Sequence, residues 1–81
     1  MTIAQITKTV HNIIKDSSET ELELTPQTHL IQEIGLSSVE AMLLLSDLED
    51  VFHIQIPVTA LREVETVGDL TQLVIQCLKT Q

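Results

Sequence analysis

A pair of serines, Ser37 and Ser38, stands between a glycine and an apolar run, and no other place in the sequence is better suited to chemistry. Gly35 favours a turn, and the residues from Ser38 onward have the apolar content of a buried helix. A serine here lies at a helix N-terminus, where backbone N–H groups lack intrahelical partners and the helix dipole is positive. The same groups would stabilise a phosphate esterified to that serine.

The same residues also have a purely structural interpretation. Ser37-Ser38-Val39-Glu40 is the S-x-x-E pattern of a capping box. In such a box the Ser37 hydroxyl accepts a hydrogen bond from the Glu40 N–H, and the Glu40 carboxylate accepts one from the Ser37 N–H. Ser38 is then simply the first helical residue. These four residues alone favour the capping box, so a modified serine needs support from the rest of the chain.

Other reactive residues give weaker signals. A serine hydrolase would need a base beside Ser38, and His29 or His53 could supply one. The sequence shows no strand-turn-helix elbow and no second domain to form a cleft, so we expect no catalytic residue. His11, His29 and His53 stand on separate elements without ligand spacing, so no metal site is expected. Cys77 has the character of a small buried hydrophobe.

Helical periodicity predicts the elements that position the serines. Apolar residues recur at helical spacing from about Thr2 to Lys15, from Ser38 to about Phe52, and from Thr66 onward. A short helix is expected from Thr59 to Glu63. The long stretch before Ser37 is predicted to be a connecting loop without regular structure. The predicted fold class is therefore all-α, a small four-helix bundle of three main helices and one short helix with a long first loop.

The long loop and the second helix carry apolar residues whose burial bears on the serines. We expect Leu22 and Leu24 to be tucked into the core by an extended loop segment. The predicted core stripe of the second helix is Ala41, Leu44, Leu45, Leu48, Val51 and Phe52. Val39 and Leu43 fall on another face of that helix. They are either buried on a second side or exposed as an apolar patch for a partner, and the sequence leaves both alternatives open.

Composition limits the class of protein. The 81 residues suit one domain, residues 1–81, with an aliphatic core that contains a single aromatic residue, Phe52. The net charge of −8 argues against nucleic acid and anionic membranes and favours basic protein surfaces as partners. A lone cysteine cannot form an internal disulfide, and no signal peptide, long apolar stretch or lipidation motif is visible. We therefore expect a cytoplasmic protein.

Several short segments form a characteristic series along nearly the whole chain. They are Leu24-Thr25-Pro26, Thr28-His29-Leu30, Ile34-Gly35-Leu36-Ser37-Ser38-Val39, Leu48-Glu49-Asp50-Val51-Phe52, Ile54-Gln55-Ile56-Pro57 and Thr66-Val67-Gly68-Asp69-Leu70. In their order and spacing, and in an acidic chain of this length, these segments resemble the acyl carrier protein family, and the resemblance is specific because it rests on all of them together.

The resemblance implies a carrier rather than an enzyme. By position Ser38 would carry a covalent 4′-phosphopantetheine derived from coenzyme A, whose thiol holds acyl intermediates as thioesters. The implied partners are a phosphopantetheinyl transferase and acyl-transfer and condensing enzymes with basic docking patches, and we expect a monomer. The partner-docking residues carried over from the family are Val39, Glu40, Asp47, Asp50 and, less directly, Glu63.

Two departures from the family pattern affect these expectations. Ser37 replaces the usual aspartate before the modified serine; it can still cap the helix but supplies no carboxylate for the transferase. Val39 replaces the usual leucine, and Leu43 stands where fatty-acid carriers tend to have an acid. These changes suggest a polyketide or hybrid-peptide pathway, with fatty acid synthesis remaining open. The alternative is an unmodified, acidic carrier-like bundle that acts as a docking or regulatory subunit.

Overall fold

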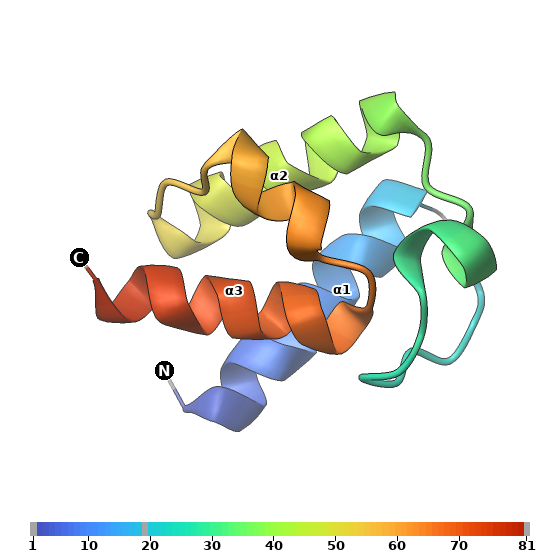
Figure 1. Ribbon diagram of the computed structural model, residues 1–81. Helices are drawn as coiled ribbons and strands as arrows, with labels where there is room; N and C mark the ends of the chain where they lie inside the picture. The colour runs from blue at the N-terminus through green and yellow to red at the C-terminus, as the bar shows by residue number, and fades with distance from the viewer. Residues whose placement is uncertain (1, 19, 81) are drawn as a thin grey trace.

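A computed structural model describes residues 2–18 and 20–80 of the chain as a helical protein (Figure 1). Its elements are, in order, α1 (Ile3–Ser18), η1 (Leu30–Ile34), α2 (Ser38–Phe52), η2 (Val58–Glu63) and α3 (Val67–Lys79). Extended pairing in the described ranges is limited to one isolated bridge between His29 and Thr66. The all-α prediction is confirmed. The four-helix description needs correction, because two short helical segments, and not one, accompany the three long helices.

The additional segment, η1, lies in the long first loop, where no regular structure was predicted. It is a single turn of π-helix, in which the Ile34 N–H donates to the His29 carbonyl at 3.2 Å. The Glu33 carboxylate accepts a hydrogen bond from the His29 N–H at 2.7 Å. Gly35 then ends the turn in the left-handed conformation, with φ of 80°, and donates its N–H to Leu30. Local hydrogen bonds and a glycine cap therefore hold a segment too short to show a helical period.

The bounds of the longer helices follow their predicted caps closely. α2 has the predicted bounds, whereas α1 continues three residues past Lys15 to Ser18. α3 begins at Val67, because Thr66 forms a capping box with Asp69. No helix in the described part of the chain is long and apolar enough to cross a membrane.

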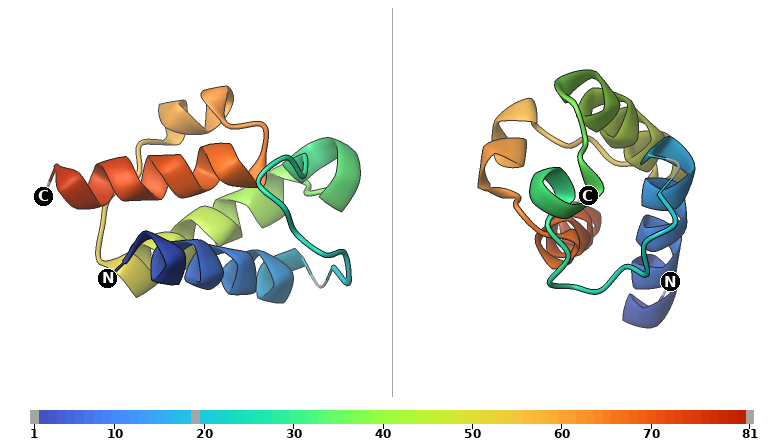
Figure 2. Two further views of the ribbon diagram at one scale, coloured as in Figure 1. Left: turned by 90° about the horizontal axis from the view of Figure 1, so that it is seen from below. Right: turned by 90° about the vertical axis from the view of Figure 1, so that its right-hand side faces the viewer.

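The core lies where α1 packs against both α2 and α3. Its most deeply buried side chains come from all three helices: Val10, Ile14, Leu48, Val67, Leu70 and Val74. η2 lies on the side of α3 that faces away from α1 (Figure 2). Leu24 is buried as expected, but Leu22 and Val51 remain 45% and 48% exposed, which contradicts their predicted burial.

The first loop is fastened to the beginning of α3 by three backbone hydrogen bonds. The Leu30 N–H donates to Glu65, the Val67 N–H to Thr28, and the Gly68 N–H to Pro26, each at 2.9 Å. As a result η1 and the first turns of α2 and α3 lie at the same end of the molecule (Figure 1). The two serines of interest lie at this end.

Candidate functional site

The corner between η1 and α2 has the geometry of a capped helix start. Ser37 is the N-cap residue, and its Oγ accepts a hydrogen bond from the Glu40 N–H at 3.2 Å. The Glu40 Oε1 in turn accepts the Ser37 N–H at 3.1 Å. The predicted capping box is therefore confirmed. Ser37 therefore caps the N-terminus of α2, and its neighbour Ser38 takes no part in the capping box.

Ser38 is exposed at the first position of α2, and its hydroxyl makes no hydrogen bond to the residues that the structure describes. The capping box occupies the N–H groups of Ser37 and Glu40 only. The N–H groups of Ser38 and Val39 stay at the open end of the helix, where they can donate to an anion. A phosphate ester on the Ser38 hydroxyl would therefore meet free donors and the positive end of the helix dipole.

An apolar cavity of about 170 Å³ opens beside this serine. Both Ser37 and Ser38 line it, and aliphatic side chains from all the elements except α1 form the rest of its wall. Its members on α2 are Ala41, Leu44, Leu45 and Leu48, and its members elsewhere are Leu30, Ile31, Leu36, Leu61, Val64 and Leu70. A flexible group attached to Ser38 can therefore fold back into an apolar space without leaving the surface of the carrier.

The Asp69 carboxylate accepts backbone hydrogen bonds at the start of α3, at the same end of the molecule as Ser38. Asp69 Oδ2 accepts the N–H groups of Glu65 and Thr66 at 3.1 and 3.2 Å. These backbone hydrogen bonds lower the pKa of the Asp69 carboxyl below its ordinary value. The carboxylate therefore stays ionised, and it supports the residues to which the loop before Ser37 is fastened.

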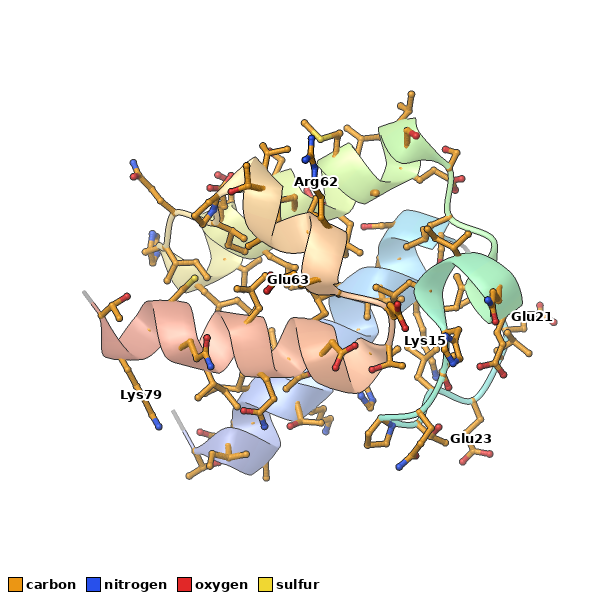
Figure 3. All side chains as sticks on the ribbon, in the orientation of Figure 1. Lys15, Glu21, Glu23, Arg62, Glu63 and Lys79 are labelled. Atoms are coloured by element: carbon orange, nitrogen blue, oxygen red, sulfur yellow. The ribbon has the colours of Figure 1, made fainter. Side chains whose placement is uncertain are left out.

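The acids predicted to dock partners differ in their surroundings. Glu40 is half-buried and belongs to the capping box, and Asp47 accepts a hydrogen bond from the Ser17 hydroxyl at 3.1 Å. Asp50 and Glu63 are exposed. In the view of Figure 3, Glu63 extends from η2 to the side of α3, and Arg62 extends to the side of α2. The structure thus places Glu63 apart from the acids of α2.

The structure decides between the two alternatives for the first turns of α2. Val39 is 69% exposed and Leu43 is 58% exposed, so both belong to a surface. Met42, one turn after Val39, is 50% exposed and extends the same face. We call Val39, Met42 and Leu43 the apolar patch. The three exposed apolar side chains are neighbours on one face of α2, next to Ser38.

The histidines and Cys77, considered in the sequence as possible catalytic or metal-binding residues, do not come together in one site in the described part of the chain. His53 caps the far end of α2 in the left-handed conformation, about 22 Å along the helix from Ser38. No group of three or more histidine, cysteine, aspartate or glutamate side chains in residues 2–18 and 20–80 could hold a metal. Cys77 is half-buried, and burial raises the pKa of its thiol. Sequence analysis did not predict η1, and so it did not predict that Ile31, which is 73% exposed, would line a cavity beside Ser38.

Comparison with known proteins gives consistent matches. Residues 4–74 match the model of the family described as the phosphopantetheine attachment site. A 53-residue segment is 36% identical to a protein of Caulobacter vibrioides described as "Probable acyl carrier protein"; it covers 65% of this chain and 62% of that protein's length. A solved structure from Mycobacterium tuberculosis, described as "a putative acyl carrier protein", superposes with a TM-score of 0.83 at 25% identity. That match covers 88% of this chain and 96% of the other.

Proposed function

Because the chain belongs to the phosphopantetheine attachment site family of acyl carrier proteins, we propose that Ser38 is the residue to which 4′-phosphopantetheine is attached. The protein is a carrier and not an enzyme. The prosthetic group supplies a terminal thiol that holds acyl groups as thioesters. The chain's own residues anchor this group, shelter what it carries and present it to partners.

The exposure of Ser38 is the observation that carries the proposal. In the active site of a transferase, its exposed hydroxyl can attack the phosphorus atom of coenzyme A that bears the pantetheine. A phosphorus–oxygen bond to Oγ forms as the pyrophosphate bond breaks, adenosine 3′,5′-bisphosphate leaves, and the serine proton passes to a base of the transferase. The Ser38 and Val39 N–H groups at the start of α2 would be free to donate to the resulting phosphodiester and would stabilise its negative charge.

The apolar cavity beside Ser38 supports a role in sheltering cargo. A buried apolar cavity of about 150 Å³ accommodates benzene, so a cavity of this size takes about six carbon atoms. The present cavity has about that volume and is lined by aliphatic side chains. A short aliphatic acyl chain gains free energy on leaving water for such a space. We therefore expect the cavity to favour short and medium acyl groups.

Docking is proposed for the face of α2 that begins at Ser38. Val39 supplies apolar contact there, and Glu40, Asp47 and Asp50 supply negative charge that steers a basic partner. Glu63, on η2 and apart from these acids, is proposed as a separate docking acid. The proposed partners are a phosphopantetheinyl transferase and acyl-transfer or condensing enzymes with basic docking patches, met by a monomeric 1–81 domain in the cytoplasm.

The apolar patch also bears on the pathway. Leu43 is exposed close to the attachment site, at a position where fatty-acid carriers tend to have an acid, and the exposed Met42 lies next to it. A partner enzyme must therefore bring an apolar spot opposite α2, surrounded by basic residues. Because an exposed apolar residue stands where fatty-acid carriers tend to have an acid, we favour a specialised polyketide or hybrid-peptide system over fatty acid synthesis.

Intact-mass measurement after incubation with a phosphopantetheinyl transferase and coenzyme A tests the attachment. We expect one added phosphopantetheine in the wild type and none in Ser38→Ala. Ser37→Ala is the matched control, because it removes the neighbouring hydroxyl. It should still be loaded while losing about 1 kcal/mol of stability through the capping box. Loading that disappears only in Ser37→Ala would move the site by one residue.

Position 37 carries a serine and not the usual aspartate, so a chain that is never modified is an alternative, and the same experiment tests it. A folded chain that no transferase modifies, and that still binds its partner, would be an unmodified docking or regulatory subunit. In that case Ser37 and Ser38 would serve only as the start of α2.

A further inference from the structure

A second cleft, lined by both polar and apolar side chains, lies between η1 and η2, next to the apolar cavity. It is open, has a volume of about 390 Å³, and is lined by residues that include His29, Gln32 and Arg62. Backbone pairing holds two of its lining residues in place, because the Leu30 N–H donates to Glu65 at 2.9 Å and His29 pairs with Thr66. The cleft lies at the end of the molecule that carries Ser38.

The cleft and the apolar cavity share a wall. Ile31, Leu61 and Val64 line both of them. Ile31 is 73% exposed and so is not held by the core, and Leu61 and Val64 are only half-buried. A chain that starts at Ser38 and fills the apolar cavity therefore meets the second cleft beyond these three shared residues.

Arg62 gives the cleft its chemical character. It is one of four lysine and arginine residues in a chain with twelve acids, yet its side chain makes no ion pair or hydrogen bond with any described residue. Figure 3 shows it on η2, extending to the side of the molecule on which α2 lies. Glu65, the acid among the residues lining the cleft, is likewise exposed and forms no ion pair with Arg62. A guanidinium without a partner beside an apolar cavity is suited to a carboxylate.

We propose that the cleft between η1 and η2 binds the free carboxylate of a dicarboxylic acyl cargo, with Arg62 as its counter-ion and the adjoining cavity holding the aliphatic part. The inference rests on the proposed attachment at Ser38. The cavity accepts roughly six carbons, and a charge cannot be buried there without a partner. A terminal carboxylate must therefore emerge from the apolar space, and the cleft beyond the shared wall offers it a cation.

The test compares three cargos of matched length, loaded through a transferase from their coenzyme A thioesters. They are heptanedioyl, its terminal methyl ester, and heptanoyl. Cleavage of each thioester by hydroxylamine reports how far the cargo is sheltered, and the NMR shift of the Arg62 Nε–H reports contact with the carboxylate. Because exposed ion pairs are weak, we expect heptanedioyl to be cleaved about two- to five-fold more slowly than the methyl ester.

The variants separate this contact from general effects of charge. Arg62→Gln should make heptanedioyl and its ester equal, Arg62→Lys should keep most of the difference, and Lys79→Gln, at the far end of α3, should leave it unchanged. Equal cleavage of the two cargos in the wild type, or a difference that survives Arg62→Gln, overturns the proposal while attachment at Ser38 stands. A chain that accepts no arm at all overturns both.

Discussion

Substituting alanine for Gly68 tests how the attachment end is held together. A Cβ at this position would lie 2.9 Å from the Pro26 carbonyl oxygen and 3.2 Å from the Pro26 Cβ. The nearest atom belongs to the backbone, and the same oxygen accepts the Gly68 N–H at 2.9 Å. The loop or the first turn of α3 must therefore shift, and the fastening between them is strained or lost.

The expected effect follows from opposing contributions. Alanine is better than glycine in a helix by at most about 1 kcal/mol. Overpacking costs about 1–3 kcal/mol, and the lost hydrogen bond costs about 0.5–1.5 kcal/mol. The clash prevails, and we expect Gly68→Ala to reduce the free energy of unfolding by about 1–3 kcal/mol. For a domain of this size that lowers the melting temperature by roughly 5–20 °C.

Thermal and urea unfolding measure this loss, and Gln72→Ala serves as the control. Gln72 is exposed on the same helix, so alanine there changes only helix propensity and should alter stability by a few tenths of a kcal/mol. Hydrogen exchange at the Val67 and Gly68 amides should accelerate in Gly68→Ala. A Gly68→Ala protein as stable as the wild type, or more stable, would refute the reasoning that Gly68 is required for close approach to Pro26.

Further predictions concern single contributions to stability and binding. Leu43→Ala should change stability by less than about 0.5 kcal/mol and weaken partner binding, whereas Leu44→Ala, buried on the other face of α2, should cost about 2–5 kcal/mol; equal losses of stability would contradict this placement. Hydrogen bonds to its ionised form lower the pKa of Asp69, so its stabilising contribution is complete above the ordinary aspartate pKa and is lost as pH falls through the folded value. Urea unfolding at pH 5 and pH 3 should therefore show a smaller loss in Asp69→Asn than in the wild type, and equal losses would exclude this role. Salt should raise the melting temperature by screening the net charge of −8, and an unchanged midpoint from low to moderate salt would contradict that expectation.

The features that sequence analysis predicted correctly depend on local signals. Ser37 and Glu40, and likewise Thr66 and Asp69, stand three residues apart, and each pair forms a capping box with hydrogen bonds in both directions. α2 has its predicted bounds because it is marked by a cap at its start and ends at Phe52, before His53 in the left-handed conformation. The family could likewise be recognised without a structure, because its motifs are read directly from the order of residues along the chain.

The features that it missed depend on contacts between distant residues. η1 is held by the Glu33 carboxylate, by Gly35 and by the bond from Leu30 to Glu65, and only the first two are local. Leu22 and Val51 have the residue type of a core but lie outside the packing of α1, α2 and α3. The position of Arg62 beside the cleft follows from how η2 lies against η1, which periodicity does not reveal.

The fastening of the first loop to the start of α3 has a consequence for the order of events during translation. A ribosome releases the segment around Pro26 and Leu30 well before it releases Glu65 and Gly68, which supply the partners of that segment. A nascent polypeptide therefore carries the serines on an unanchored stretch, and only the finished domain presents them at a fixed corner. A transferase that recognises this shape would leave incomplete chains unloaded, so that coenzyme A is not consumed on products that can never deliver an acyl group.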